Sequence, residues 1–141
     1  MDDDVEPAKP KPVHWVASSR KDIRKFPKGV RLTFGQALFD AQTGKKHPHA
    51  KPLKGFGGAG VLEVVEEHSG GTYRAIYTVR FEGIVYVLHT FQKKSKVGIK
   101  TPSEEIAKVR RRLKEAEKHY AEWSKQQKRE AEKHHGPIDR D

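Results

Sequence analysis

The strongest constraint on the fold is a pair of strand-forming segments separated by only two residues. Residues 73–81 alternate between apolar and polar side chains, and residues 84–91 are rich in apolar, β-branched and aromatic types. The intervening Glu82 and Gly83 are typical of a hairpin turn. The sequence therefore predicts two antiparallel strands, and the first should direct one set of side chains into the core: Tyr73, Ala75, Tyr77, Val79 and Phe81.

The hairpin also predicts which polar side chains share a face of the sheet. Counting outward from the turn places Ile76 opposite His89 and Arg74 opposite Phe91. Arg74 and His89 then become diagonal neighbours, roughly 7 Å apart. A guanidinium and an imidazole should therefore lie side by side on one face.

Four lysines follow the second strand, and no acidic residue occurs in residues 84–100. They are Lys93, Lys94, Lys96 and Lys100. Several cations at the end of a strand are suited to bind an anion, for which a phosphate backbone is the obvious candidate. The alternative is a solvated loop, because runs of charge often have no partner.

Two helices are predicted before these strands. Ser19, followed three residues later by Asp22, resembles a capping box that begins a short helix with Ile23 and Phe26 directed inward. In residues 28–43, apolar side chains recur at spacings of three and four, which indicates an amphipathic helix. These apolar residues are Val30, Phe34, Ala37, Leu38 and Ala41.

A third helix is predicted after the lysines. Thr101 is a suitable N-cap, Pro102 fits the first helical position, and Glu104 can reach back to the cap. An apolar stripe then extends over residues 106–123 and should pack on the domain or on a partner. It consists of Ile106, Val109, Leu113, Ala116, Tyr120 and Trp123.

The remaining segments are a short strand at residues 13–16, a strand at residues 61–66 and a loop that precedes the latter. This loop is rich in glycine and proline, and its GFGGAG run matches neither common phosphate-binding glycine motif. His47 and His49 lie in it without a third ligand at a suitable spacing, so no metal site is predicted.

These elements predict an α+β domain with a small, twisted, antiparallel-containing sheet of about four strands, two N-terminal helices and a C-terminal helix. The helices are expected on one face, leaving the other face, with Arg74, Thr78 and Arg80, partly open. The domain should span residues 13–123. Residues 1–12 are predicted to be a disordered tail, and residues 124–141 a polar helical extension or a disordered tail.

The amino-acid composition limits the kinds of partner and site that the protein can have. The 141 residues include 29 Lys and Arg against 19 Asp and Glu, a net charge of +10, which favours an anionic partner such as nucleic acid. The absence of cysteine excludes disulfides and thiolate metal sites. No apolar run is long enough to cross a membrane, and the acidic start does not resemble a signal peptide. We therefore expect a soluble cytoplasmic protein with no membrane partner.

Two segments resemble the phage-derived (Gp-like) branch of the RelE/HigB toxin superfamily. They are KPLKGFGGAGVLEVVEEHSGGTYRAIYTVRF, from residue 51, and VYVLHTFQKKSKVGIKTPSEEIAKVRRRL, from residue 85. The resemblance implies a RelE-like fold and a type II toxin that inhibits translation by cleaving free or ribosome-bound mRNA. It also implies cleavage without a metal or other cofactor, and a helix-turn-helix antitoxin as partner.

The chemistry of such cleavage suggests roles for the residues on the predicted face. Arg74 would clamp the phosphate, His89 would act as acid or base, and Lys93 and Lys94 would stabilise the transition state. A second set would bind the RNA backbone: Lys51, Lys54, Arg80, Lys96 and Lys100.

Structural roles compete with each assignment, since His89 could be a satisfied histidine within the sheet and Arg74 an arginine on a solvated face. Superfamily members often end just after the last strand with a tyrosine or histidine near the site, whereas a long helix follows here. Two other functions therefore stay open: a non-catalytic RNA- or ribosome-binding module, and a protein-interaction domain that uses the stripe of residues 106–123.

Overall fold

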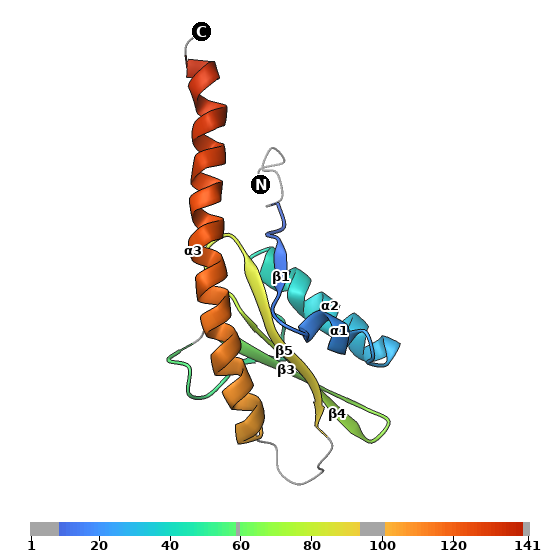
Figure 1. Cartoon of the computed structure of the whole chain (residues 1–141). Helices are drawn as coiled ribbons and strands as arrows, with labels where there is room; N and C mark the ends of the chain where they lie inside the picture. Colours follow the sequence, from blue (N-terminus) through green and yellow to red (C-terminus); the bar gives the residue numbers. More distant parts are fainter. Residues whose placement is uncertain (1–8, 59, 94–100, 140–141) are drawn as a thin grey trace.

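The computed structural model describes residues 9–58, 60–93 and 101–139, with side chains described as far as Lys133. Within these residues the chain forms five strands and three helices (Figure 1). Their order is β1 (Val13–Trp15), α1 (Ser19–Ile23), α2 (Lys28–Gln42), β2 (Ala50–Pro52), β3 (Val61–His68), β4 (Gly71–Thr78), β5 (Val85–Lys93) and α3 (Ser103–Asp139). The predicted α+β class is confirmed, with one strand, β2, more than the four expected.

The five strands form one sheet in the order β1-β5-β4-β3-β2, so the two edge strands are only three residues long. Strand β1 pairs in parallel with β5, and the other pairs are antiparallel. The predicted register is confirmed, because Ile76 pairs with His89 and Arg74 with Phe91. Arg74 and His89 therefore occupy neighbouring positions of the central strand pair.

The link between β4 and β5 is longer than the predicted two residues. Strand β4 ends at Thr78 and β5 begins at Val85, so six residues connect them. The expected turn does occur, since the Ile84 N–H donates to the Phe81 carbonyl at 3.5 Å and Gly83 has a φ of 89°. The strands have already separated at this point, because the backbone N–H of Val79 donates instead to the Gly60 carbonyl.

Helices α1 and α2 cover one face of the sheet (Figure 1). The apolar side of α2 was predicted correctly, since all five of its expected inward residues are buried. Phe26 at the end of the α1 region also joins this core, where its ring lies 6.1 Å from that of Phe34. The cap of α1 was predicted wrongly: Ser18 holds the N-cap position, whereas the Ser19 hydroxyl is buried and donates to the Val87 carbonyl.

Helix α3 covers the opposite face of the sheet, and its C-terminal half continues beyond the sheet (Figure 1). Its residues Val109, Leu113 and Ala116 are buried in a second core with Ile76 and Leu88 of the sheet. The prediction that this face is partly open, with all helices on the other side, is therefore wrong. The stripe of residues 106–123 packs on its own domain and is not available to bind a partner helix.

No helix in the described part of the chain combines the length and apolar character needed to span a membrane.

Candidate functional site

Three of the four predicted catalytic residues lie on the α3-facing side of the sheet. Arg74 is on β4, and His89 and Lys93 are on β5. The fourth, Lys94, lies outside the described residues, as do Lys96 and Lys100. The three described side chains are buried, with exposed fractions of 4% for Arg74, 3% for His89 and 9% for Lys93. The sheet thus gathers these cationic and titratable groups beneath other parts of the chain.

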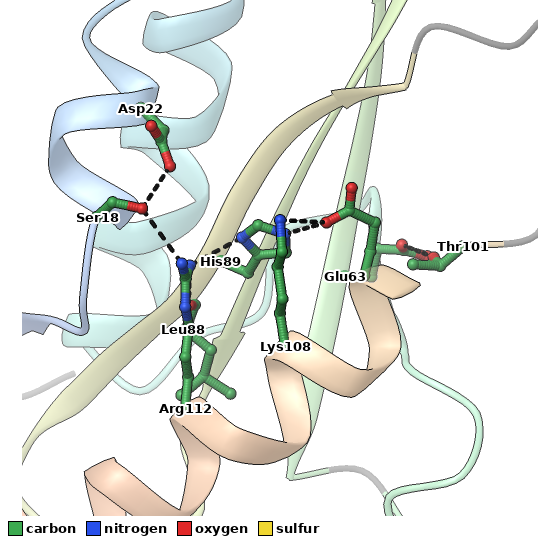
Figure 2. Close-up of polar contacts among 9 residues, drawn as sticks. Ser18, Asp22, Glu63, Leu88, His89, Thr101, Lys108 and Arg112 are labelled. Atoms are coloured by element: carbon green, nitrogen blue, oxygen red, sulfur yellow. Dashed lines mark hydrogen bonds and ion pairs between the residues drawn. The ribbon is translucent and has the colours of Figure 1, made fainter. Parts of the chain in front are cut away.

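The guanidinium of Arg74 is neutralised by a carboxylate. Its Nη1 donates to Glu63 Oε2 on β3 at 3.0 Å and to the Thr101 hydroxyl at 3.3 Å. The Thr101 hydroxyl in turn donates to the same carboxylate oxygen (Figure 2). Thr101 was predicted to cap α3, but its side chain serves this ion pair instead.

A β-bulge in β5 directs His89 toward α3. Ile76 pairs with His89 while Tyr77 pairs with Val87, so the residue between them, Leu88, is an extra residue in β5. Leu88 packs in the core under α3, and His89 bonds to side chains of α3. A regular strand would direct these two neighbours to opposite faces.

Both ring nitrogens of His89 bond to α3. Arg112 Nη1 donates to Nδ1 at 2.9 Å (Figure 2). Glu105 Oε1 lies 2.6 Å from Nε2. Because a guanidinium can only donate, Nδ1 must accept, and the ring proton resides on Nε2 and is donated to Glu105. His89 is therefore a neutral imidazole that connects two oppositely charged residues of α3.

The electrostatic surroundings agree with a neutral ring. Burial lowers the pKa of His89 below its usual value of 6.5, and the nearby cations Arg112 and Lys108 act in the same direction. The bond to Glu105 opposes this shift, but burial has the larger effect. Although the short contact with Glu105 resembles an ion pair, the donor on Nδ1 excludes a second ring proton in this arrangement.

The network around His89 joins α1, β5 and α3. Arg112 also donates to the Leu88 carbonyl at 3.1 Å and to the Ser18 hydroxyl at 3.2 Å, and this hydroxyl donates to Asp22 at 2.7 Å (Figure 2). Lys108 Nζ lies 3.7 Å from Glu105 Oε1. Sequence reasoning missed Glu63, Glu105 and Arg112. The spacing of Glu105 and Arg112 could have revealed two of them, since they flank Val109 at four and three residues and so face the same way.

This network predicts that stability decreases as the pH falls. A histidine whose pKa is lowered by folding stabilises the protein fully above its unfolded pKa of 6.5 and loses that contribution as the pH falls below it. The pKa of His14 is also lowered, by burial and by the adjacent His119, and acts with the same sign. We expect Tm to fall between pH 7.5 and 5.5, and to fall less in His89→Gln.

The matched control for this experiment is His49→Gln, in the exposed loop before β2. Its Tm profile should follow that of the unmodified protein. If His89→Gln and His49→Gln lost stability equally on acidification, the proposed linkage to His89 would be wrong.

The predicted RNA-binding residues Lys51, Lys54 and Arg80 are exposed. Lys51 on β2 pairs with Glu63, so it lies in the same row across the sheet as Ile76 and His89. Arg80 binds the glycine-rich loop after β2, where its Nη2 donates to the Phe56 carbonyl at 2.7 Å. The sheet therefore places Lys51 beside Glu63, the ion-pair partner of Arg74, and Arg80 at the glycine-rich loop.

The rings of His47 and His49 contact each other, with centroids 5.1 Å apart. Among the described residues, no three histidine or carboxylate side chains are grouped so that they could hold a metal ion.

Two solved structures are similar to this chain. A mutant of the E. coli toxin RelE in the free state is similar with a TM-score of 0.51 and 19% identity, covering 74% of this chain and 99% of that chain. The RelBE2 toxin-antitoxin complex of Mycobacterium tuberculosis gives a TM-score of 0.42 and 21% identity, covering 60% of this chain and 100% of that chain. The similarity to the E. coli toxin shows that the chain has a RelE-like fold.

The family model described as phage derived protein Gp49-like (DUF891) matches residues 21–114, which is more than half of the chain. The chain belongs to this family, which confirms the predicted resemblance to a phage-derived, Gp-like family, and its fold is similar to that of RelE, as the resemblance implied. No curated protein matches it.

Proposed function

We propose that this protein is the toxin of a type II toxin-antitoxin system and that it cleaves mRNA in the cytoplasm without a metal. Membership of the Gp49-like family and the RelE fold support this proposal. The observation that carries it is the placement of Arg74, His89 and Lys93 on one face of the β4–β5 pair.

In this reaction the 2′-oxygen of the RNA attacks the adjacent phosphorus, and the bond to the 5′-oxygen breaks. The products are a 2′,3′-cyclic phosphate and a 5′-hydroxyl, so one proton leaves the 2′-oxygen and one is added to the 5′-oxygen. Arg74 would hold two phosphate oxygens, and Lys93 with Lys94 would stabilise the added negative charge. His89 would transfer a proton, as its chemistry near neutral pH allows.

Access to these groups requires a local change in the start of α3. The carboxylates of Glu63 and Glu105 bond to Arg74 and His89 where phosphate oxygens of an RNA would have to bind. Displacing residues 101–105 from the sheet would remove Thr101 from Arg74 and Glu105 from His89. RNA phosphates would then take the places of the Glu63 and Glu105 carboxylates beside Arg74 and His89, so that each of these two side chains would still have an anionic partner.

A second function is favoured by a specific observation. Because both ring nitrogens of His89 bond to protein side chains, the histidine serves to attach α3 to the sheet in this arrangement. A protein that kept these bonds while bound to RNA would be a non-catalytic RNA- or ribosome-binding module. Incubation of mRNA with purified protein and translating ribosomes distinguishes the two: cleavage supports the toxin, and salt-sensitive binding without cleavage supports the module.

The proposed partner is an antitoxin with a helix-turn-helix domain. The E. coli protein of similar fold is described as a toxin, and the mycobacterial one was solved in a toxin-antitoxin complex. We expect induced expression of this chain to arrest growth, and co-expression of the adjacent small reading frame to restore it. Normal growth at high expression of the folded chain would contradict the proposal.

A further inference from the structure

The outward side of α3 carries a row of cations that the functional assignments above do not use. At 100° per residue, five of these side chains fall on the side of the helix opposite Val109, Leu113 and Ala116, and the other two, Arg110 and Lys128, lie at the edge of that side. All are exposed: Arg110, Arg111, Lys114, Lys118, Lys125, Lys128 and Arg129. We refer to these seven residues as the α3 basic row.

The α3 basic row is poorly compensated by acidic residues. Among the described residues, its only ion pair joins Lys125 to Glu122, at 3.9 Å. Several of its members are like-charge neighbours at a spacing of four, such as Lys114 with Lys118 and Lys125 with Arg129. Such pairs destabilise a helix, although the acidic residues three or four positions away reduce the repulsion: Glu115, Glu117, Glu122 and Glu132. An external anion would remove this repulsion.

The row is long and straight. From Arg110 to Arg129 it extends along about 28 Å of helix, at 1.5 Å per residue. At its Arg110 end it meets the glycine-rich loop, where the Arg110 guanidinium lies 4.6 Å from the Phe56 ring centroid and Arg80 binds the Phe56 carbonyl. The cationic surface therefore continues from the helix onto the body of the domain.

We propose that the α3 basic row binds the phosphate backbone of a nucleic acid duplex without sequence preference. A rigid row of this length matches the regularly spaced phosphates of a duplex. Proteins that bind single strands offer exposed aromatic rings for base stacking. On this part of α3 the aromatic side chains are Tyr120 and Trp123, and both pack toward the sheet.

A membrane surface is the less suitable anionic partner. A helix that lies on a lipid bilayer inserts an apolar side between the lipids. The apolar side of α3 is occupied by the sheet, because Val109 and Ala116 are fully buried there. Beyond Trp123 the helix is polar on all sides through Lys133.

The test measures binding of the full chain to a 20-base-pair RNA duplex, a DNA duplex and a single-stranded RNA of equal length, by fluorescence anisotropy at several salt concentrations. The row variant combines Lys114→Gln, Lys118→Gln, Lys125→Gln and Lys128→Gln. The control combines Lys25→Gln, Lys28→Gln, Lys45→Gln and Lys46→Gln, which removes the same charge from exposed positions near α1 and α2. Circular dichroism verifies that α3 stays helical.

We expect the unmodified protein to bind a duplex more tightly than the single strand. The row variant should bind at least about tenfold more weakly, and the slope of log K against log salt should become shallower by about three to four. The control should change both quantities much less, and the same four positions changed to arginine should retain binding. The RNA and DNA duplexes together show which nucleic acid is preferred.

Equal losses in the row variant and the control would overturn the proposal, because the effect would then reflect net charge alone. Tighter binding of the single strand would also overturn it. The result is independent of RNA cleavage, since the row lies on the opposite side of α3 from Arg74 and His89. A chain that binds duplex but does not arrest growth would contradict only the proposed toxin function.

Discussion

The free energy of unfolding is expected to fall by about 3–5 kcal/mol when Phe34 is replaced by alanine. Phe34 lies on α2, is 0% exposed and packs in the core with Phe26 and residues of the sheet. Its removal would leave a cavity in the core that holds α1 and α2 to the sheet, and neighbouring side chains can only partly fill it. Urea denaturation followed by circular dichroism measures the change.

The chain offers a closely matched control for this experiment. Phe39 lies on the same helix five residues later but is 54% exposed. Phe39→Ala removes the same atoms from the surface, so stability should change by no more than about 0.5 kcal/mol. Similar losses in the two variants would show that the sheet-facing side of α2 has been assigned wrongly.

Growth arrest is expected to disappear when Arg74 is replaced by glutamine. If Arg74 holds the phosphate, its loss should slow cleavage by about 10²–10³-fold, as removal of a single charge-stabilising group does in other enzymes. Cells expressing Arg74→Gln should then grow nearly as fast as uninduced cells. Growth curves after induction, with protein levels compared by immunoblot, measure this effect.

Arg74→Gln could abolish growth arrest either by removing catalysis or by unfolding the protein, so a second variant is needed to distinguish the two. Removing Arg74 leaves the Glu63 carboxylate without its guanidinium partner, which destabilises a folded protein. The double variant Arg74→Gln with Glu63→Gln removes both charges and should stay folded. Arg20→Gln, an exposed arginine on α1, should arrest growth fully. A folded double variant that still arrested growth would exclude Arg74 from the chemistry.

Much of the fold could be predicted because local patterns determine it. The spacing of Val30, Phe34 and Leu38 identified the buried side of α2, and counting from the Glu82-Gly83 turn identified the register of β4 with β5. The alternation wrongly placed Val79 in the core, because β4 ends at Thr78 and Val79 is 37% exposed. Strand β2 was missed because Pro52 and the following glycines are poor strand formers. It forms through its ladder with β3, which is a tertiary contact.

The environment of the candidate site could not be predicted in the same way. The apolar stripe of α3 has a clear period, but a period does not specify which surface it covers. The unbroken apolar run of residues 84–88 was the signal that both faces of β5 are buried. The bulge at Leu88 depends on strand pairing, so the bonds of His89 to Glu105 and Arg112 could not be read from the sequence.

The short strands at the two margins of the sheet have a consequence for the behaviour of the protein in solution. Unpaired backbone groups at a sheet margin can recruit strands from other molecules and begin aggregation. Here the margins are β1 and β2, each of three residues, and Pro52 in β2 has no N–H to donate. The long apolar strands β4 and β5 are enclosed between them and the helices. The fold therefore prevents these long strands from pairing with strands of other molecules. This arrangement disfavours aggregation even at high protein concentration.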